Sequence, residues 1–293
     1  MRYLTTCAVA LVLSIPAPSE AAKKTLRVRV MTYNIRFDFK SDQGNRWAQR
    51  VDAVAEQILK SGAQIVCLQE DKLEQVKDLQ KRLPQFTFVG RGRNATGFGE
   101  RTSILYRGDQ LQLREQGDFW LSDTPSIPGS NTWGDKYPRK VTWAVFEGKK
   151  GGPAIMVLNV HLPSGKNQML RTRGVQLIHS WILEKLKRNR GAANVHALLL
   201  AGDFNAAPDS APHALLTDDR RLPLLDVWEV VQPNDPHPGT YGGWEGLQTK
   251  KRIDWLLIAG QVRVRACDKL EAPIQGRYPS DHYPVIADLQ ISL

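Results

Sequence analysis

The amino-acid sequence predicts an α/β sandwich, in which two mixed or antiparallel β-sheets pack together and helices flank them. Its 293 residues are 42% hydrophobic and 24% charged, which is typical of a soluble globular protein with a sizeable core. Many short apolar segments follow one another in the manner of hairpins, with few alternations of strand and helix. Helical segments that are long enough to cover two sheets lie among them.

The first part of the chain alternates two strands with two helices. Residues 26–35 alternate apolar and basic side chains and then become wholly apolar, which predicts a strand. A helix is expected over residues 46–62, where apolar residues recur at helical spacing and a glycine supplies the stop. The apolar run 64–70 predicts a buried strand. A second helix, over residues 73–83, is ended by the proline that follows it.

The remainder of the chain is rich in predicted strands. Residues 122–138 are rich in proline, glycine and serine, and they predict a long loop. Residues 168–190 are the longest helix candidate, and the basic residues near their end suit a helix C-terminus. The predicted strands of this part cover residues 102–107, 111–119, 141–147, 154–160, 195–201, 253–258, 262–266 and 285–291.

The first 21 residues have the pattern of a secretory signal peptide. Arg2 gives a positive start, residues 4–15 are mostly apolar, and small residues lie near Ala21. This segment is too short to span a membrane, and no other segment approaches the roughly 20 apolar residues that a span requires. We therefore expect export to the periplasm or the medium, cleavage near Ala21 or Ala22, and one domain over residues 22–293.

The chain is basic, with a formal net charge of +10. The predicted cleavage removes one arginine and one glutamate, so the mature protein keeps this charge. A basic surface attracts phosphate-bearing molecules, nucleic acid included. The same charge also serves solubility alone, and composition does not separate the two interpretations.

Two cysteines remain after the predicted cleavage, Cys67 and Cys267. An exported protein can join such a pair in a disulfide. Cys67, however, lies in an apolar, strand-like run, where a buried free thiol is the commoner state. We favour two free thiols, and neither has metal-ligand spacing with another cysteine.

Polar or ionisable side chains stand where several predicted strands begin or end. Each one alone is most simply a turn residue or a solvated charge. Their joint occurrence is different, because strands of stacked sheets can bring their ends together at one edge. The side chains concerned are Asn34, Gln69 and Glu70, Asn159 and His161, Asp203 and Asn205, Asp254, and Ser280, Asp281 and His282.

Several carboxylates in one site are costly to keep charged without a cation. The donors are mostly oxygens, which suit Mg²⁺, with Mn²⁺ or Ca²⁺ as alternatives. A zinc site would need more closely spaced histidine or cysteine residues, and the HExxH pattern is absent. A hard cation binds phosphate oxygens well, so the residues alone point to metal-assisted phosphoester chemistry.

The segments resemble motifs of the endonuclease/exonuclease/phosphatase family, which includes pancreatic-type deoxyribonuclease, abasic-site endonucleases, inositol phosphatases, sphingomyelinases and deadenylases. The resemblance covers about residues 27–292, and six segments in the family's order make chance a poor explanation. The pair GDFN and SDH is the most specific. The six segments are TYN (32–34), QE (69–70), NVH (159–161), GDFN (202–205), RID (252–254) and SDH (280–282).

The resemblance implies a four-layer sandwich, with two sheets packed face to face and helices outside. It implies that Glu70 holds the metal ion, with Asn34 and Asp281 close by. Asp203 would orient or deprotonate the attacking water. Asn205 would bind the scissile phosphate.

Five further residues receive roles from the same resemblance. His282 would contact the phosphate or assist as an acid, with Asp254 hydrogen-bonded behind it to fix its tautomer. Glu100 stands where the family has a carboxylate that pairs with the histidine matched by His161. Arg139 stands where nuclease relatives have a phosphate-binding arginine. A solvated loop charge and a surface cation are the alternatives for Glu100 and Arg139.

The expected function is that of a secreted, monomeric, divalent-metal-dependent hydrolase of phosphoric esters. We favour a phosphodiesterase or nuclease, because the chain is basic and Arg139 resembles a nuclease phosphate contact. One alternative is a phosphomonoesterase, or a hydrolase of lipid, sugar or inositol phosphates, with the same fold. Another is a catalytically silent binding module. Loop aromatics either rim the cleft or only pack the loops; they are Trp120, Trp133, Tyr137, Tyr241 and Trp244.

Overall fold

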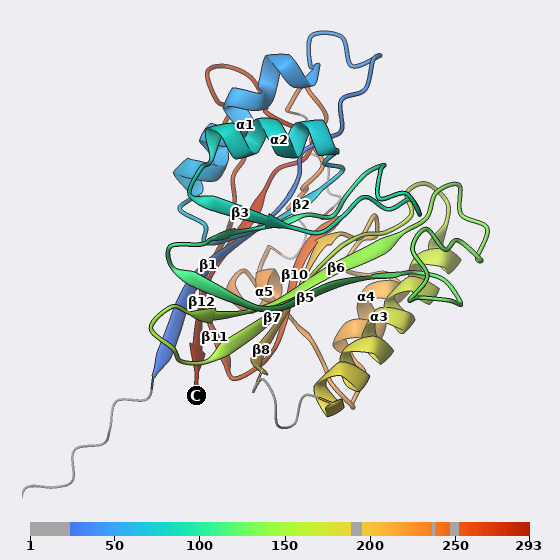
Figure 1. The fold of residues 1–293 in the computed structure, drawn as a ribbon, viewed down its shortest axis with the longest axis vertical. Helices are drawn as coiled ribbons and strands as arrows, with labels where there is room; N and C mark the ends of the chain where they lie inside the picture. The colour runs from blue at the N-terminus through green and yellow to red at the C-terminus, as the bar shows by residue number, and fades with distance from the viewer. Residues whose placement is uncertain (1–23, 189–194, 236–237, 247–251) are drawn as a thin grey trace, which may run out of the picture.

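A computed structural model describes residues 24–188, 195–235, 238–246 and 252–293. The predicted signal peptide, residues 1–21, lies outside the described residues. Within them the chain forms a four-layer α/β sandwich, with two β-sheets in the middle and helices on both outer sides (Figure 1). The predicted fold class is therefore confirmed.

The first sheet has six strands in the order β11-β12-β1-β2-β4-β3. Only β1 and β2 run parallel in it, and the other neighbours are antiparallel. Its strands are β1 (Thr25–Asn34), β2 (Ile65–Gln69), β3 (Phe86–Val89), β4 (Ile104–Arg107), β11 (Val262–Lys269) and β12 (Val285–Ser292).

The second sheet also has six strands, in the order β5-β6-β7-β8-β10-β9. Here β7 and β8 form the parallel pair. Its strands are β5 (Leu111–Trp120), β6 (Lys140–Gly148), β7 (Ala154–His161), β8 (Val195–Asp203), β9 (Leu225–Asp226) and β10 (Asp254–Gly260).

Helices form the two outer layers. At the top of Figure 1, α1 (Trp47–Ser61) and α2 (Leu73–Arg82) cover the first sheet. On the opposite side, α3 (Gln168–Arg188) and α4 (Ala211–Thr217) cover the second sheet. The short helix α5 (Val227–Val231) follows β9 directly.

The central strands are apolar on both faces because each face packs against a different layer. In β1, Val30 belongs to the core between the sheets, whereas Met31 packs under α1. In β8, Leu199 faces the first sheet and Leu200 lies in the core beneath α3. Successive side chains of a strand point to opposite faces, so burial of both faces requires a continuous apolar run.

Each sheet contains one β-α-β unit, and this places polar residues at one edge of the sandwich. The helix α1 connects parallel β1 and β2, and α3 connects parallel β7 and β8. Parallel strands end at the same edge of a sheet, and ligands in such folds bind outside these carboxyl ends. The two parallel pairs thus provide the base of a site.

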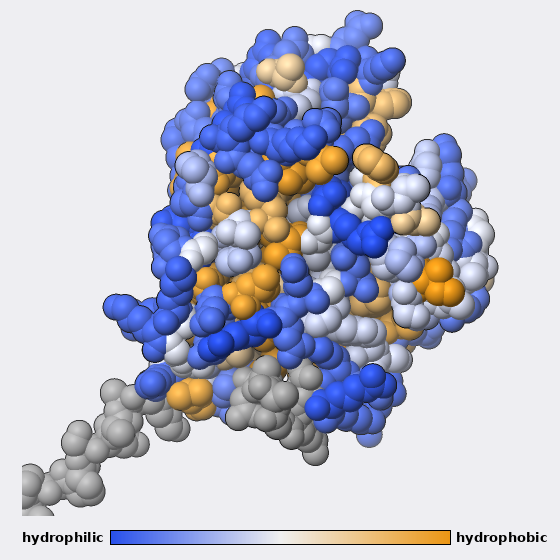
Figure 2. Space-filling view, in the orientation of Figure 1, coloured by the Kyte–Doolittle hydropathy of each residue, from blue (hydrophilic) through white to orange (hydrophobic). Residues whose placement is uncertain are grey.

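The predicted strands and helices are found with small shifts at their ends. Sequence patterns missed the short elements β3, β9, α4 and α5, which have too few residues for a periodic signal. Cys67 and Cys267 are buried and free, as expected. Among the described residues, no helix has the length and apolarity needed to cross a bilayer. Most of the face shown in Figure 2 is hydrophilic, and the hydrophobic residues visible on it lie mainly near its centre.

Candidate active site

A cavity of about 590 Å³ opens at the edge where the parallel strands end. Most predicted site residues line it, and the two that do not, Asn34 and Asp254, are buried behind residues that do. The predicted residues in its wall are Glu70, Glu100, Arg139, His161, Asp203, Asn205, Asp281 and His282. The fold thus brings together predicted site residues that lie far apart in the sequence.

Strand register explains this convergence. The last residues of β7 and β8, His161 and Asp203, are directly paired. Asp254 begins β10 and pairs with Asp203 from the other side, because β10 is antiparallel to β8. In the first sheet, Asn34 at the end of β1 pairs with Gln69, the residue before Glu70. One residue of slip in any pair would turn a site side chain to the opposite face.

The GDFN segment fixes its polar residues by close packing. Gly202 has φ +149°, and a Cβ atom there would lie 2.0 Å from the carbonyl oxygen of Val160 on the neighbouring strand. Phe204 is fully buried and stacks on Trp255, with 4.3 Å between ring centroids. Asp203 therefore leaves the sheet from a backbone that is held on both sides.

Backbone strain is concentrated at the same place. Outside glycine, four described residues have a positive φ, and three of them line the cavity: Arg36 (54°), Glu70 (62°) and Asn205 (49°). Side chains other than asparagine and aspartate rarely adopt this conformation, and such strain persists where surrounding structure enforces it. In Asn205 the enforcing contacts include its own N–H, which donates to Asp203 Oδ1 at 2.9 Å.

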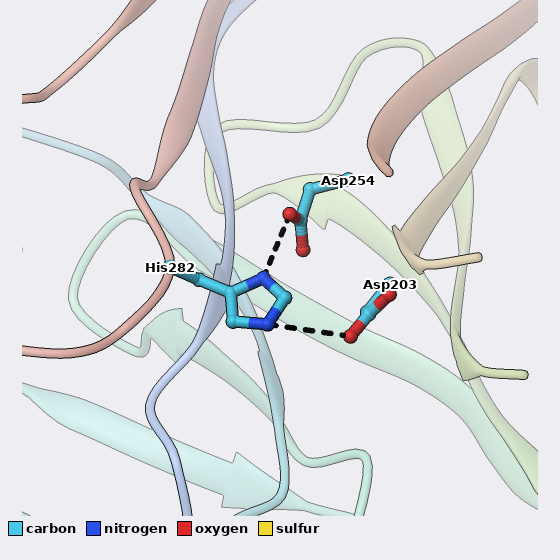
Figure 3. Close-up of side chains that lie close together, drawn as sticks. All are labelled: Asp203, Asp254 and His282. Atoms are coloured by element: carbon cyan, nitrogen blue, oxygen red, sulfur yellow. Dashed lines mark hydrogen bonds and ion pairs between the residues drawn. The ribbon is translucent and has the colours of Figure 1, made fainter. Parts of the chain in front are cut away.

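His282 lies between two carboxylates (Figure 3). Its Nδ1 is 2.9 Å from Asp254 Oδ2, and its Nε2 is 3.8 Å from Asp203 Oδ2. Burial lowers the pKa of His282, but the charges of Asp254 and Asp203 outweigh it and raise the pKa to about 10. Burial, followed by the charge of Asp254, raises the pKa of Asp203 to about 7. At neutral pH this arrangement favours an imidazolium that faces an aspartate able to exchange a proton.

Asn34 joins the two halves of the site. Its Nδ2 donates to Asp203 Oδ2 at 3.0 Å and to Glu70 Oε1 at 3.2 Å, and its Oδ1 accepts from Arg36 N at 3.0 Å. In this orientation Asn34 holds two carboxylates at a fixed separation. Its oxygen faces the backbone of Arg36, so its predicted role as a metal ligand stays a prediction.

Glu70 and Asp281 provide the other two predicted metal ligands. Burial, followed by the charge of Asp281, raises the pKa of Glu70. The Arg36 guanidinium lies 3.9 Å from both carboxylates, while it bonds more closely to Asp42 at 2.9 Å. The buried Asp281 and the half-buried Glu70, with Arg36 as the one described arginine between them, fit a hard divalent cation, which would relieve their repulsion.

The described residues contain a tighter set of metal-capable groups in Asp203, Asp254 and His282. A metal on Nδ1 of His282 would have to replace the hydrogen bond to Asp254, and the protonated ring already supplies positive charge there. The predicted metal ligands Glu70 and Asp281 are not part of this set, and their role stays a prediction.

A second such set, His213, Asp226 and Glu229, lies outside the cavity. The positive charge beside its carboxylates is that of an arginine side chain. Arg252 Nη1 is 2.7 Å from Asp226 Oδ2, and its Nη2 is 3.0 Å from Glu229 Oε1. The buried guanidinium already neutralises these carboxylates, so this set is a structural ion network beneath the active site.

Glu100 has a different main partner from the one expected. Its carboxylate forms a two-pronged ion pair with Arg93, with both N–O distances 2.9 Å, whereas His161 Nδ1 is 4.0 Å away. Burial, followed by the charges of Arg139 and Arg93, lowers the pKa of His161 well below its usual value. His161 is therefore a neutral imidazole, with its Nε2 3.5 Å from Asp203 Oδ2.

Arg139 is buried at the wall of the cavity, and its guanidinium is only partly hydrogen-bonded. Its Nε donates to Asp135 at 3.2 Å, whereas its Nη1 is buried and has no hydrogen-bond partner among the described residues. An unpaired buried N–H group is costly. Arg139 also lines the cavity, so its guanidinium is placed to bind a phosphate oxygen there.

The loop aromatics divide into two groups. Tyr137 and Tyr241 line the cavity and are 41% and 38% exposed, so they are available to a substrate. Trp120 is buried, and its indole donates to Arg93 O at 2.7 Å. Trp133 donates to Asp123 in its own loop, and Trp244 covers Arg50. The packing interpretation therefore holds for Trp120 and Trp133.

Comparison with known proteins identifies the family. The model of the Endonuclease/Exonuclease/phosphatase family matches residues 31–282, which includes every segment of the cavity described above. The chain belongs to this family. Its members are enzymes that hydrolyse phosphoric ester bonds with the help of divalent metal ions, and this site contains acidic groups that could bind such an ion.

Two solved structures resemble this family member over nearly their whole length. An Endonuclease/Exonuclease/phosphatase family protein from Bacteroides thetaiotaomicron is 28% identical, with a TM-score of 0.83, over 93% of this chain and 98% of the other. A mannosyl-6-phosphatase from the same organism is 29% identical, with a TM-score of 0.80, over 89% of this chain and 99% of the other.

A curated relative matches over a smaller part of its own length. The probable RNA exonuclease NGL3 of Saccharomyces cerevisiae is 24% identical over an alignment of 230 residues that covers 72% of this chain. The alignment covers 43% of the yeast protein, so the chain spans less than half the length of that relative.

Sequence reasoning missed two arginines of this family member's cavity, Arg36 and Arg93. Arg36 lies two residues after the TYN motif, and its proximity to the motif was the available signal. Arg93 lies in a polar loop with no pattern of its own, and only its contact with Glu100 reveals it.

Proposed function

We propose that this chain is a divalent-metal-dependent hydrolase whose substrates are small phosphomonoesters, such as sugar phosphates. The observation that carries the proposal is the convergence of Glu70, Asp203, Asp281 and His282 on one cavity. Its volume of about 590 Å³ falls within the roughly 300–1,000 Å³ of small-molecule sites. The full-length similarity to a mannosyl-6-phosphatase supports the choice of substrate class.

Glu70 and Asp281 would hold the cation, with Asn34 beside them, and the oxygen donors favour Mg²⁺, with Mn²⁺ or Ca²⁺ as alternatives. When bound, such a cation supplies positive charge to the phosphoryl oxygens. Arg139 would bind a phosphoryl oxygen through its guanidinium, and Asn205 would bind another. These contacts fix the phosphorus atom in front of Asp203.

Asp203 would orient the attacking water and accept its proton, and a carboxyl group with a pKa of about 7 is matched to this task near neutrality. As the new P–O bond forms, the bond to the alcohol breaks, and His282 gives its proton to the leaving oxygen. Asp203 Oδ2 and His282 Nε2 are 3.8 Å apart, too far for a direct hydrogen bond, so the proton would return to the imidazole through a bridging water. Asp254 holds the ring in place during this cycle.

A substrate panel tests the proposal. Purified protein is assayed with Mg²⁺ on sugar phosphates, nucleotides, single- and double-stranded DNA, and RNA, with Asp203→Ala as the control. Release of inorganic phosphate from sugar phosphates by the wild type alone supports it. Hydrolysis at the wild-type level by Asp203→Ala would show that the activity does not come from this site. It would refute the assigned chemistry and favour a catalytically silent binding module.

A nuclease is the second candidate, favoured by the net charge of +10 and by the similarity to a probable RNA exonuclease. Cleavage of nucleic acid in the panel, with no release of phosphate from sugar phosphates, would select it. Rates on nucleic acid should then fall steeply with salt, because each phosphate contact releases counterions. Rates on a small ester should depend on salt much less.

We propose that the enzyme acts outside the cytoplasm, on the basis of the signal-peptide pattern of residues 1–21. The test is expression of the full chain followed by cell fractionation and N-terminal mass spectrometry. A mature N-terminus near residue 22 in the exported fraction supports the proposal, and an uncleaved cytoplasmic protein contradicts it.

A further inference from the structure

Arg50 is a buried arginine of α1. It lies behind the side of the cavity that carries the predicted metal ligands. It is 3% exposed, and no carboxylate of the described residues lies within ion-pair distance of its guanidinium. A buried cation without a paired anion is costly, so the contacts that replace the anion indicate what the residue does.

Its guanidinium donates only to backbone carbonyls, and these come from separate segments. Nη1 donates to Ile35 O and, at 3.1 Å, to Pro279 O, while Nη2 donates to Arg36 O. Nε donates to Asn45 O at 2.9 Å. Residues 35 and 36 directly follow Asn34, and residue 279 precedes Asp281 by two positions. A single planar group thus connects the two segments that carry predicted metal ligands.

Two indole rings hold the guanidinium in position. The Cζ atom lies 5.2 Å from the ring centroid of Trp47 and 5.2 Å from that of Trp244. A guanidinium interacts well with aromatic faces and loses little freedom when it is stacked. Trp244 belongs to the loop of Tyr241, whose ring packs edge-on against His282 with 5.1 Å between the ring centroids.

The connection matters because the segment after Asn34 is strained. Arg36 has a φ of 54°, and its carbonyl oxygen accepts from both Arg50 and Gln75 Nε2, the latter at 3.0 Å. In this backbone conformation its side chain lies 3.9 Å from both Glu70 and Asp281. Without the donors on its carbonyl, the backbone would be free to relax and the ligand spacing would change.

We propose that Arg50 is a positioning residue that sets the affinity of the site for its divalent cation, by fixing residues 34–36 relative to residues 279–282. The proposal rests on the proposed function for the presence of a cation. It assigns no contact between Arg50 and the cation or the substrate. Residues that orient metal ligands from behind typically change metal affinity by about 10- to 100-fold when replaced.

The test is calorimetric titration of Mg²⁺ and Mn²⁺ into wild type, Arg50→Lys and Arg50→Met, with circular dichroism and melting curves to establish folding. Arg50→Lys keeps the charge but loses the planar set of donors, so we expect its metal affinity to fall about tenfold. The loss of metal affinity should be larger in Arg50→Met. If Arg50→Met fails to fold, Arg50→Lys decides, and wild-type affinity in a folded Arg50→Lys would overturn the proposal.

Arg171 offers a matched control. It is 9% exposed and likewise donates to carbonyls, those of Pro163 and Gly165, both at 2.9 Å, and Gly165 lines the cavity. Arg171→Met should lower the melting temperature without changing metal affinity. An equal loss of affinity in Arg171→Met would show that Arg50 acts only through general stability.

These experiments can refute the proposed function and the role of Arg50 independently of each other. Calorimetry needs no substrate, so a wild type that binds Mg²⁺ but hydrolyses no phosphoric ester would refute the proposed function alone. A wild type that is an active hydrolase, with folded Arg50 variants of unchanged metal affinity, would refute the role of Arg50 alone.

Discussion

Nδ1 of His282 and Oδ2 of Asp254 lie 2.9 Å apart, and both residues are buried. The pair joins the segment before β12 to the first residue of β10, so a contact between the two sheets orients the imidazole toward Asp203. In this arrangement Asp254 fixes which ring nitrogen faces the cavity and stabilises the protonated ring.

Replacement of Asp254 by asparagine should lower kcat by about 10- to 100-fold, because the amide keeps the shape but not the charge. KM should change less, since Asp254 does not line the cavity. Steady-state kinetics on the best substrate of the panel measures both. Asp288→Asn is the control, because that aspartate pairs with Arg29 and does not line the cavity. A kcat within twofold of wild type in Asp254→Asn would show that the pairing is only structural.

Arg139→Met should raise KM about tenfold or more. A hydrogen bond to a charged group contributes about 1.5–3 kcal/mol, and about 1.4 kcal/mol corresponds to a factor of ten. The control is Arg114→Met, since Arg114 pairs with Glu147 at the surface. Competitive inhibition by inorganic phosphate gives an independent measure, and unchanged inhibition in Arg139→Met would contradict the assignment.

Gly202→Ala should abolish the folded state or lower the free energy of unfolding by more than about 4 kcal/mol, which is exceptional for one substitution. The added methyl group would collide with the carbonyl oxygen of Val160. Gly152→Ala is the matched control, because Gly152 also has a positive φ (+131°) but has no atom within 4 Å of the new Cβ. Gly152→Ala should lower the free energy of unfolding only by its backbone strain, about 1–3 kcal/mol. Urea unfolding measures both, and equal losses would contradict the steric argument.

Asp38 should make a pH-dependent contribution to stability. Its hydrogen bonds with Arg46 lower its pKa to about 2, against about 3.9 in an unfolded chain. A lowered pKa stabilises the fold above the unfolded value, and this stabilisation is lost as the pH falls from about 4 through about 2. Both side chains are partly exposed, so the effect should be below about 1 kcal/mol.

The comparison of Asp38→Asn with wild type in melting experiments at pH 7 and pH 2.5 measures this contribution. The variant should melt lower at pH 7, and the difference should shrink at pH 2.5, where the wild-type carboxylate is partly protonated. A difference of the same size at both pH values would assign the effect to hydrogen bonding with Trp47 N rather than to charge.

Short-range patterns in the sequence were sufficient for the longer elements and for many residues in and around the cavity. A strand between two layers must be apolar on both faces, and it can be polar only where it ends. The apolar run before Asp203 therefore indicated both the strand and the position of the carboxylate at its end. The same reasoning identified Asn34, His161 and Asp254 from local sequence alone.

Only the tertiary structure decided which side chains face one another. The contact of Arg50 with Pro279 joins residues 229 positions apart, and the pairing of Glu100 with Arg93 depends on how a loop without a periodic pattern folds back. Helical and strand periodicities report which face of an element is buried, and they contain no information about the partner on that face. Strand order and register supply this information, because they set which strand ends meet at the cavity.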